Sequence, residues 1–71
     1  MPVGIVQFFL EQKGYGYIRV PETREEFFVH RRHLKAPVKR GDQVRFVIQE
    51  DQQGLYAAEV ERIKEADQAE K

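Results

Sequence analysis

The stretch KGYGYI, residues 13–18, sets two tyrosines among glycines that cannot cover them. Alternate side chains on a strand point to the same face, so Tyr15 and Tyr17 are expected to lie together. Lys13 and Arg19 continue that face on either side. Charged side chains resist burial, which indicates that the face is exposed to solvent. Rings beside cations suit the recognition of unpaired nucleobases, because rings stack on bases and cations neutralise phosphates.

A second aromatic segment, FFVH at residues 27–30, predicts a short strand that pairs with the first. If Phe27 and Val29 face the core, Phe28 and His30 lie outside, beside the tyrosines. Four flat rings then form one exposed patch, and an exposed apolar patch marks a binding site more often than ordinary surface does. The alternative is that these rings form half of a conventional hydrophobic core.

The elements that must position these rings are five short predicted strands. Gly14 and Gly16 bring no side chains to the opposite face and permit the tight bending that a small barrel needs. Five strands without a long helix favour an all-β, closed or nearly closed barrel, because a flat sheet of this size would leave an edge and half a core uncovered. The predicted strands, bounded by turn-forming residues, cover 3–10, 15–20, 27–30, 44–49 and 55–60.

The 71 residues are assigned to one domain, at residues 1–62, followed by an acidic tail at 63–71. From Glu61 onward the chain is mostly Glu, Lys, Ala and Gln without an apolar stripe, which predicts a frayed helix or a disordered segment. A domain of this size buries only roughly 60% of its unfolded surface, so its stability is expected to be marginal. We expect a monomer.

The twelve basic and twelve acidic residues cancel in total but not in position. Residues 30–46 carry six Lys or Arg and one acid, whereas residues 49–71 carry seven acids and three bases. This asymmetry predicts a polarised surface whose basic part suits an anionic partner. The alternative is that the charges only keep a small barrel soluble.

Several functional classes are disfavoured by the residue types present. The absence of cysteine excludes disulfides and thiolate metal sites, and no apolar run reaches the ~18 residues that span a bilayer. The N-terminus lacks the pattern of a secretory signal, so a cytoplasmic location is expected. His30 and His33 lack a third metal ligand and a converging nucleophile, and no GxxxxGK[ST] phosphate loop is present. We therefore expect neither enzyme activity nor a cofactor, metal, membrane or small-molecule substrate.

Together these segments resemble the cold-shock domain family. Residues 13–18 match its first motif, Lys-Gly-Phe/Tyr-Gly-Phe/Tyr-Ile, in full. Residues 27–30 match its second motif, Val-Phe-Val-His, with Phe in place of the leading Val. The resemblance covers residues 3–60. It includes flanking positions in the first, fourth and fifth predicted strands and the turn before the fourth: Gly4, Val6, Phe9, Gly41, Val44, Phe46, Ala57, Ala58 and Val60.

The resemblance implies a five-stranded antiparallel OB-fold barrel that binds single-stranded RNA and DNA with low sequence specificity. Members often act as RNA chaperones by melting weak secondary structure. Carried over by position, the stacking residues are Phe8, Tyr15, Tyr17, Phe28 and His30, with Lys13 at a phosphate. The alternative class is a small β-barrel interaction module that binds an acidic peptide with the same rings and cations.

Departures from the family pattern affect the expected site. In the first strand Gln7 and Phe8 stand where the family usually has Lys-Trp, so a cation is lost and the ring is smaller. Arg31 replaces the usual aromatic, and its guanidinium plane can stack on a base or pair with a phosphate. Tyr56 replaces a polar residue and is expected to add a ring at the edge of the patch. The loop after the third strand is short and lacks an aromatic, with a basic set in compensation: Arg32, Lys35, Lys39 and Arg40.

Overall fold

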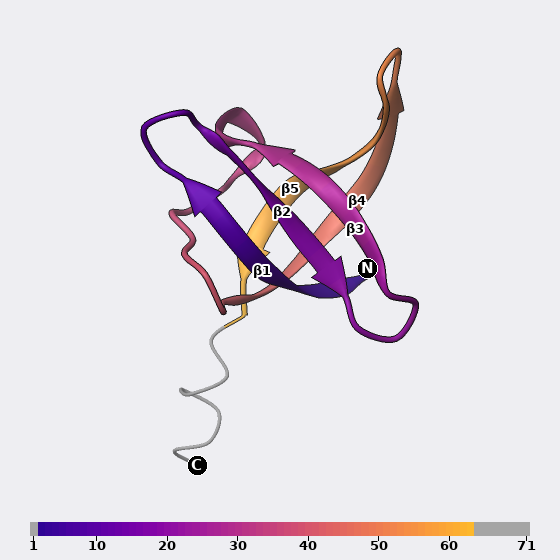
Figure 1. Cartoon of the computed structure of the whole chain (residues 1–71), viewed down its shortest axis with the longest axis horizontal. Helices are drawn as coiled ribbons and strands as arrows, with labels where there is room; N and C mark the ends of the chain where they lie inside the picture. Colours follow the sequence, from indigo (N-terminus) through magenta and orange to yellow (C-terminus); the bar gives the residue numbers. More distant parts are fainter. Residues whose placement is uncertain (1, 64–71) are drawn as a thin grey trace.

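A computed structural model describes residues 2–63, which form a closed five-stranded barrel (Figure 1). Its strands are β1 (Val3–Leu10), β2 (Tyr15–Val20), β3 (Glu25–His30), β4 (Gln43–Asp51) and β5 (Gly54–Arg62), with a short 3₁₀ helix, η1 (Arg31–His33), after β3. The order around the barrel is β1-β2-β3-β5-β4, and β4 returns to β1. The predicted five-stranded barrel of OB type is therefore confirmed.

The pairing is antiparallel between neighbours except at the β3–β5 seam, which is parallel. An entirely antiparallel barrel, as first expected, is thus correct for most of the wall but not for this seam. Two residue pairs make the seam: Phe28 with Tyr56, and Val29 with Ala57. Just beyond it, a parallel bridge between Leu34 and Val60 continues the closure.

Three strands are longer than predicted, and the additions are polar. β3 begins at Glu25, and β4 extends to Asp51 in a hairpin that rises beyond the body of the barrel (Figure 1). β5 includes Glu61 and Arg62, which the composition had grouped with the tail segment. After it, the Ile63 N–H donates to the Gln43 carbonyl oxygen at 2.8 Å. The remainder of the predicted tail, 64–71, lies outside the described residues.

The core is filled by apolar side chains that alternate inward from all five strands. Phe27 and Val29 face inward as predicted, and the Phe27 ring lies 5.6 Å from that of Phe46, centroid to centroid. Ile48 is 40% exposed, and it lies beyond residues 43–45, the part of β4 that pairs with β1. The fully buried large side chains are Val6, Ile18, Val29, Val44, Phe46 and Val60.

Gly16 allows β1 and β2 to approach closely beneath the exposed rings. A Cβ added there would overlap the Phe8 carbonyl oxygen and lie 2.8 Å from the Phe9 Cα. The register of β1 against β2 shifts between Val6 and Phe8, so the strand bends at the same place. The expectation that glycine serves the tight curvature agrees with this geometry. Within residues 2–63, no helix has the length and apolar character to cross a bilayer.

Candidate functional site

The pairing of β2 with β3 brings the predicted rings together. The register sets Tyr15 opposite His30 and Tyr17 opposite Phe28. The Phe28 ring centroid lies 5.8 Å from that of Tyr15, nearly parallel at 27°, and 5.8 Å from that of Tyr17, edge-on at 77°. β1 contributes Phe8, whose ring lies 5.6 Å from Tyr17. We call this group the aromatic platform: Phe8, Tyr15, Tyr17, Phe28 and His30.

The aromatic platform lies on the outer side of the barrel wall. Phe8 is 38% exposed and the other four side chains are half-buried, whereas the alternate residues Ile18 and Val29 have no exposure. Contacts of the offset and edge-on kinds stabilise the orientation of neighbouring rings. The platform therefore presents preorganised aromatic faces, held by backbone pairing, to a planar ligand. The alternative that these rings form half of the core is wrong.

Arg31, at one margin of the platform, is turned against the β1–β2 turn. Its Nη2 donates to the Glu11 carbonyl oxygen at 2.7 Å, and its backbone N–H donates to the Gly14 carbonyl oxygen at 2.8 Å. A Cβ added to Gly14 would lie 3.0 to 3.4 Å from three guanidinium atoms of Arg31. The guanidinium group of Arg31 is thus packed against the turn at Gly14. The φ angle of Gly14 is +81°, in a region of backbone conformation that favours glycine.

His30 and His33 are distinguished by their hydrogen bonds and surroundings. His30 Nδ1 accepts from the Arg32 backbone N–H at 3.2 Å, which places the proton of a neutral ring on Nε2. The His33 ring lies 4.8 Å from the ring of Tyr56, tilted by 36°. Burial lowers the pKa of His33, the positive charge of Arg32 and the electrostatic interaction with His30 lower it further, and the Asp51 carboxylate opposes the shift. These surroundings favour the neutral form of His33.

The contact between His33 and Tyr56 extends the aromatic surface beyond the predicted residues. Tyr56 is the backbone neighbour of Phe28 across the β3–β5 seam, as its predicted place at the edge of the patch requires. His33 had been considered only as a metal ligand, because its stacking depends on the 3₁₀ turn and on a non-local seam. A cleft of about 470 Å³, here called the hairpin cleft, is lined by residues of both ring groups. Its lining comprises Tyr17, Phe28, His30, Arg32, His33, Asp51, Gln53, Gly54, Leu55 and Tyr56.

Two cations of the basic middle segment, Lys35 and Arg45, form ion pairs with acidic residues of β5. Lys35 Nζ lies 3.5 Å from Glu61 Oε2 and 4.0 Å from Glu59 Oε1, and Arg45 Nε lies 2.9 Å from Glu61 Oε1. The hydrogen bond from Arg45, followed by the charge of Lys35, lowers the pKa of Glu61. The expected electrostatic contribution of Lys35 to an anion site is therefore reduced by internal pairing.

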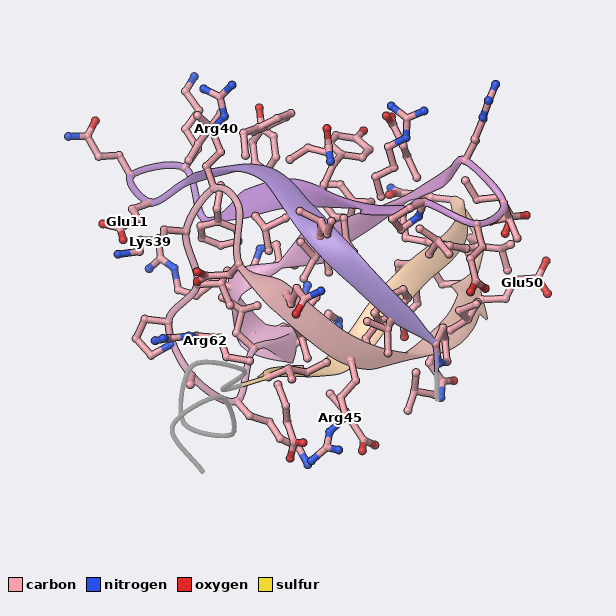
Figure 2. The ribbon with its side chains drawn as sticks, turned by 90° about the horizontal axis from the view of Figure 1, so that it is seen from below. Glu11, Lys39, Arg40, Arg45, Glu50 and Arg62 are labelled. Atoms are coloured by element: carbon pink, nitrogen blue, oxygen red, sulfur yellow. The ribbon has the colours of Figure 1, made fainter. Side chains whose placement is uncertain are left out.

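Other cations remain around the platform. Lys13 and Arg32 are exposed, and Arg19 is half-buried on the face that carries the tyrosines. Figure 2 shows Arg40 and Arg45 extending from opposite sides of the barrel, so the basic segment is divided between two surfaces. In the part of the chain that the structure describes, no three His, Asp or Glu residues are placed to hold a metal ion.

The chain is similar to known proteins along most of its length. The family described as the 'Cold-shock' DNA-binding domain matches residues 3–63. Cold shock protein CapB of Pseudomonas syringae pv. tomato is 34% identical over 64 residues, covering 84% of this chain and 91% of the relative. Major cold shock protein CspA of Pseudomonas aeruginosa is 37% identical over 62 residues, covering 82% and 88%. Major cold shock protein of Micrococcus luteus is 33% identical over 67 residues, covering 89% and 100%.

Proposed function

The chain belongs to the cold-shock domain family of nucleic-acid-binding proteins, and we propose that it binds single-stranded RNA or DNA by stacking bases on the aromatic platform. The observation that carries the proposal is the Phe28 ring, set between Tyr15 and Tyr17 on the outer side of the wall. Stacking one base on an aromatic side chain contributes roughly 1–3 kcal/mol and tolerates any base, because every base has a π-face. Low sequence specificity follows from this mode.

The proposed contacts divide by chemistry. Bases stack on the aromatic platform, with Tyr56 at its edge. Lys13, Arg19 and Arg31 meet phosphates, and the counterions they displace make binding dependent on salt. One N–H group of Arg31 donates to the Glu11 carbonyl oxygen, and Gly14 lies against the guanidinium group. The remaining N–H groups of Arg31 are therefore assigned to a phosphate contact, and its guanidinium plane is not assigned to base stacking.

An RNA-chaperone activity is a direct consequence of such binding. A protein that binds only unpaired strands shifts the equilibrium between paired and unpaired RNA toward the unpaired form by mass action. Weak secondary structure melts first, because the binding free energy needs to exceed only a small pairing free energy. The function needs no catalysis and no cofactor, and we propose that it is carried out by a cytoplasmic monomer.

Intrinsic fluorescence offers a direct test. The chain has no tryptophan and three tyrosines, Tyr15, Tyr17 and Tyr56, all of which lie in or beside the proposed interface. Titration with oligo-dT is expected to quench tyrosine emission in a saturable way, and more weakly at high salt. A parallel titration with a heteropolymeric acidic peptide of matched charge tests the alternative function, that of a module that binds acidic peptides. Saturable binding of the peptide with no response to oligo-dT would reverse the proposal in favour of a protein-interaction module.

A further inference from the structure

The aromatic surface continues past the platform toward the β4–β5 hairpin. At the β1–β2 end, Arg31 stands against Gly14 and Glu11, and the following segment, 34–40, contains no aromatic residue. At the opposite end, the β3–β5 seam sets Tyr56 next to Phe28, and η1 adds the ring of His33. A strand lying on the platform therefore finds the rings of Tyr56 and His33 toward the β4–β5 hairpin.

The hairpin cleft has the size and walls of a site for one planar group. Its volume, about 470 Å³, falls within the roughly 300–1,000 Å³ of small-molecule sites. Tyr17, Phe28, His33 and Tyr56 all contribute rings to its lining. Several rings in the lining of one open cleft suit a flat ligand ring, because that ring can stack on one of them and contact its neighbours at their edges.

The polar groups at the rim give the cleft an orientation. Arg32 is exposed beside His33 and offers donors to a phosphate. On the hairpin side Asp51 Oδ1 accepts from the Gln53 backbone N–H at 2.8 Å, which fixes a negative carboxylate there. A phosphate is attracted to the Arg32 rim and repelled from the Asp51 rim. A nucleotide whose base enters the cleft thus has a preferred direction for its backbone.

We propose that His33 and Tyr56 complete an additional base-binding subsite, in which one unpaired nucleobase enters the hairpin cleft and Arg32 meets its phosphate. The bound strand then runs from Phe8 across the platform and onto the β4–β5 hairpin. The inference rests on the proposed function and deepens it by assigning the path of the strand on this chain.

The test compares oligo-dT strands of three to eight nucleotides on the full chain, with affinity measured by fluorescence anisotropy of a labelled strand. Tyr56→Ala and His33→Ala are each expected to weaken binding of the longest strand about 5- to 150-fold, the equivalent of one lost stack. Tyr56→Phe keeps the ring and is expected to weaken binding less than Tyr56→Ala does. Gln52→Ala changes an exposed residue of the same hairpin outside the cleft lining and serves as the matched control.

The two levels of the proposal fail in different ways. If wild-type protein binds no oligonucleotide of any length, the proposed function and the subsite are both wrong. If wild type binds but Tyr56→Ala and His33→Ala match it at every length, the subsite alone is wrong. Because Tyr56 belongs to a barrel strand, thermal melting of each variant is measured as well. His33 lies in η1 outside the barrel wall, so His33→Ala tests the subsite even if Tyr56→Ala unfolds.

Discussion

Phe27 and Phe28 are adjacent in β3 and occupy opposite sides of the barrel wall. Phe27 is 3% exposed and packs against Phe46, whereas Phe28 lies outside between Tyr15 and Tyr17. Of these two neighbouring phenylalanines, Phe27 contributes to the stability of the core and Phe28 to the proposed binding surface.

Phe28→Ala is expected to weaken oligonucleotide binding by ~1–3 kcal/mol, the range for loss of one stacking ring. The fold is expected to survive, because the ring lies outside the core. Phe27→Ala is the matched control, and deletion of its buried ring is expected to cost ~3–5 kcal/mol of stability. In a domain of marginal stability that loss unfolds a large fraction of the protein. Circular dichroism melts and anisotropy titrations measure the two effects. An unfolded Phe28→Ala would show that the platform is part of the core.

Salt dependence is expected to distinguish two exposed lysines. Lys13 is exposed in the turn between β1 and β2, two residues before Tyr15, whereas Lys35 is paired with Glu61 and Glu59. For a single strand the slope of log affinity against log salt changes by about 0.7 for each phosphate contact. Lys13→Ala is expected to reduce the slope by about that amount, and Lys35→Ala to leave it nearly unchanged. Equal slopes for wild type and Lys13→Ala would remove this lysine from the phosphate contacts.

The pKa of His33 is expected to lie below its usual value of 6.5, chiefly because of burial and then because of Arg32 and His30. The folded protein then binds fewer protons at this site than the unfolded chain does. Stability is therefore expected to decrease as pH falls from about 6.5 through the folded pKa. NMR titration of the imidazole protons measures the pKa. Arg32→Ala is expected to raise it and Asp51→Asn to lower it, and opposite responses would contradict the assignment of charges around His33.

Gly16→Ala is expected to destabilise the barrel more than Gly54→Ala does. A Cβ on Gly16 would overlap the Phe8 carbonyl oxygen, so β1 and β2 must separate. Gly54, at φ +122°, has nothing within 4 Å of an added Cβ, so its substitution costs only backbone strain. Chemical denaturation compares the two. A larger loss for Gly54→Ala would mean that close strand approach contributes less to stability than turn geometry.

The local periodicity of β2 and β3 was sufficient to predict the platform rings other than Phe8, which followed from the family resemblance. Alternation fixed which of Phe27 and Phe28 faces outward, and pairing of neighbouring strands set Tyr15 against His30. These are short-range relationships, since the two strands are joined by a turn of four residues, 21–24. The five strands themselves followed from β-branched and aromatic runs separated by turn residues.

Relationships across the closing seam could not be predicted in the same way. The stacking of His33 on Tyr56 joins residues 23 positions apart through a parallel pairing that no local pattern indicates. The pairing of Lys35 and Arg45 with Glu61 likewise depends on β5 continuing through residues that resemble a tail. Arg31 was expected beside the ligand because of its position in the family pattern and the chemistry of its guanidinium group. Its hydrogen bond to Glu11 depends on the conformation of a turn that the residue types alone do not determine.

The parallel seam has a mechanical consequence for the barrel. Its inner pair, Val29 and Ala57, is fully buried, and its outer pair, Phe28 and Tyr56, lines the hairpin cleft. Because the seam has only two residue pairs, it is the part of the barrel at which local opening of the sheet is expected. A ligand that contacts both outer rings would have to lose one contact before β3 and β5 could separate. Ligand binding would therefore oppose opening of the barrel at this seam.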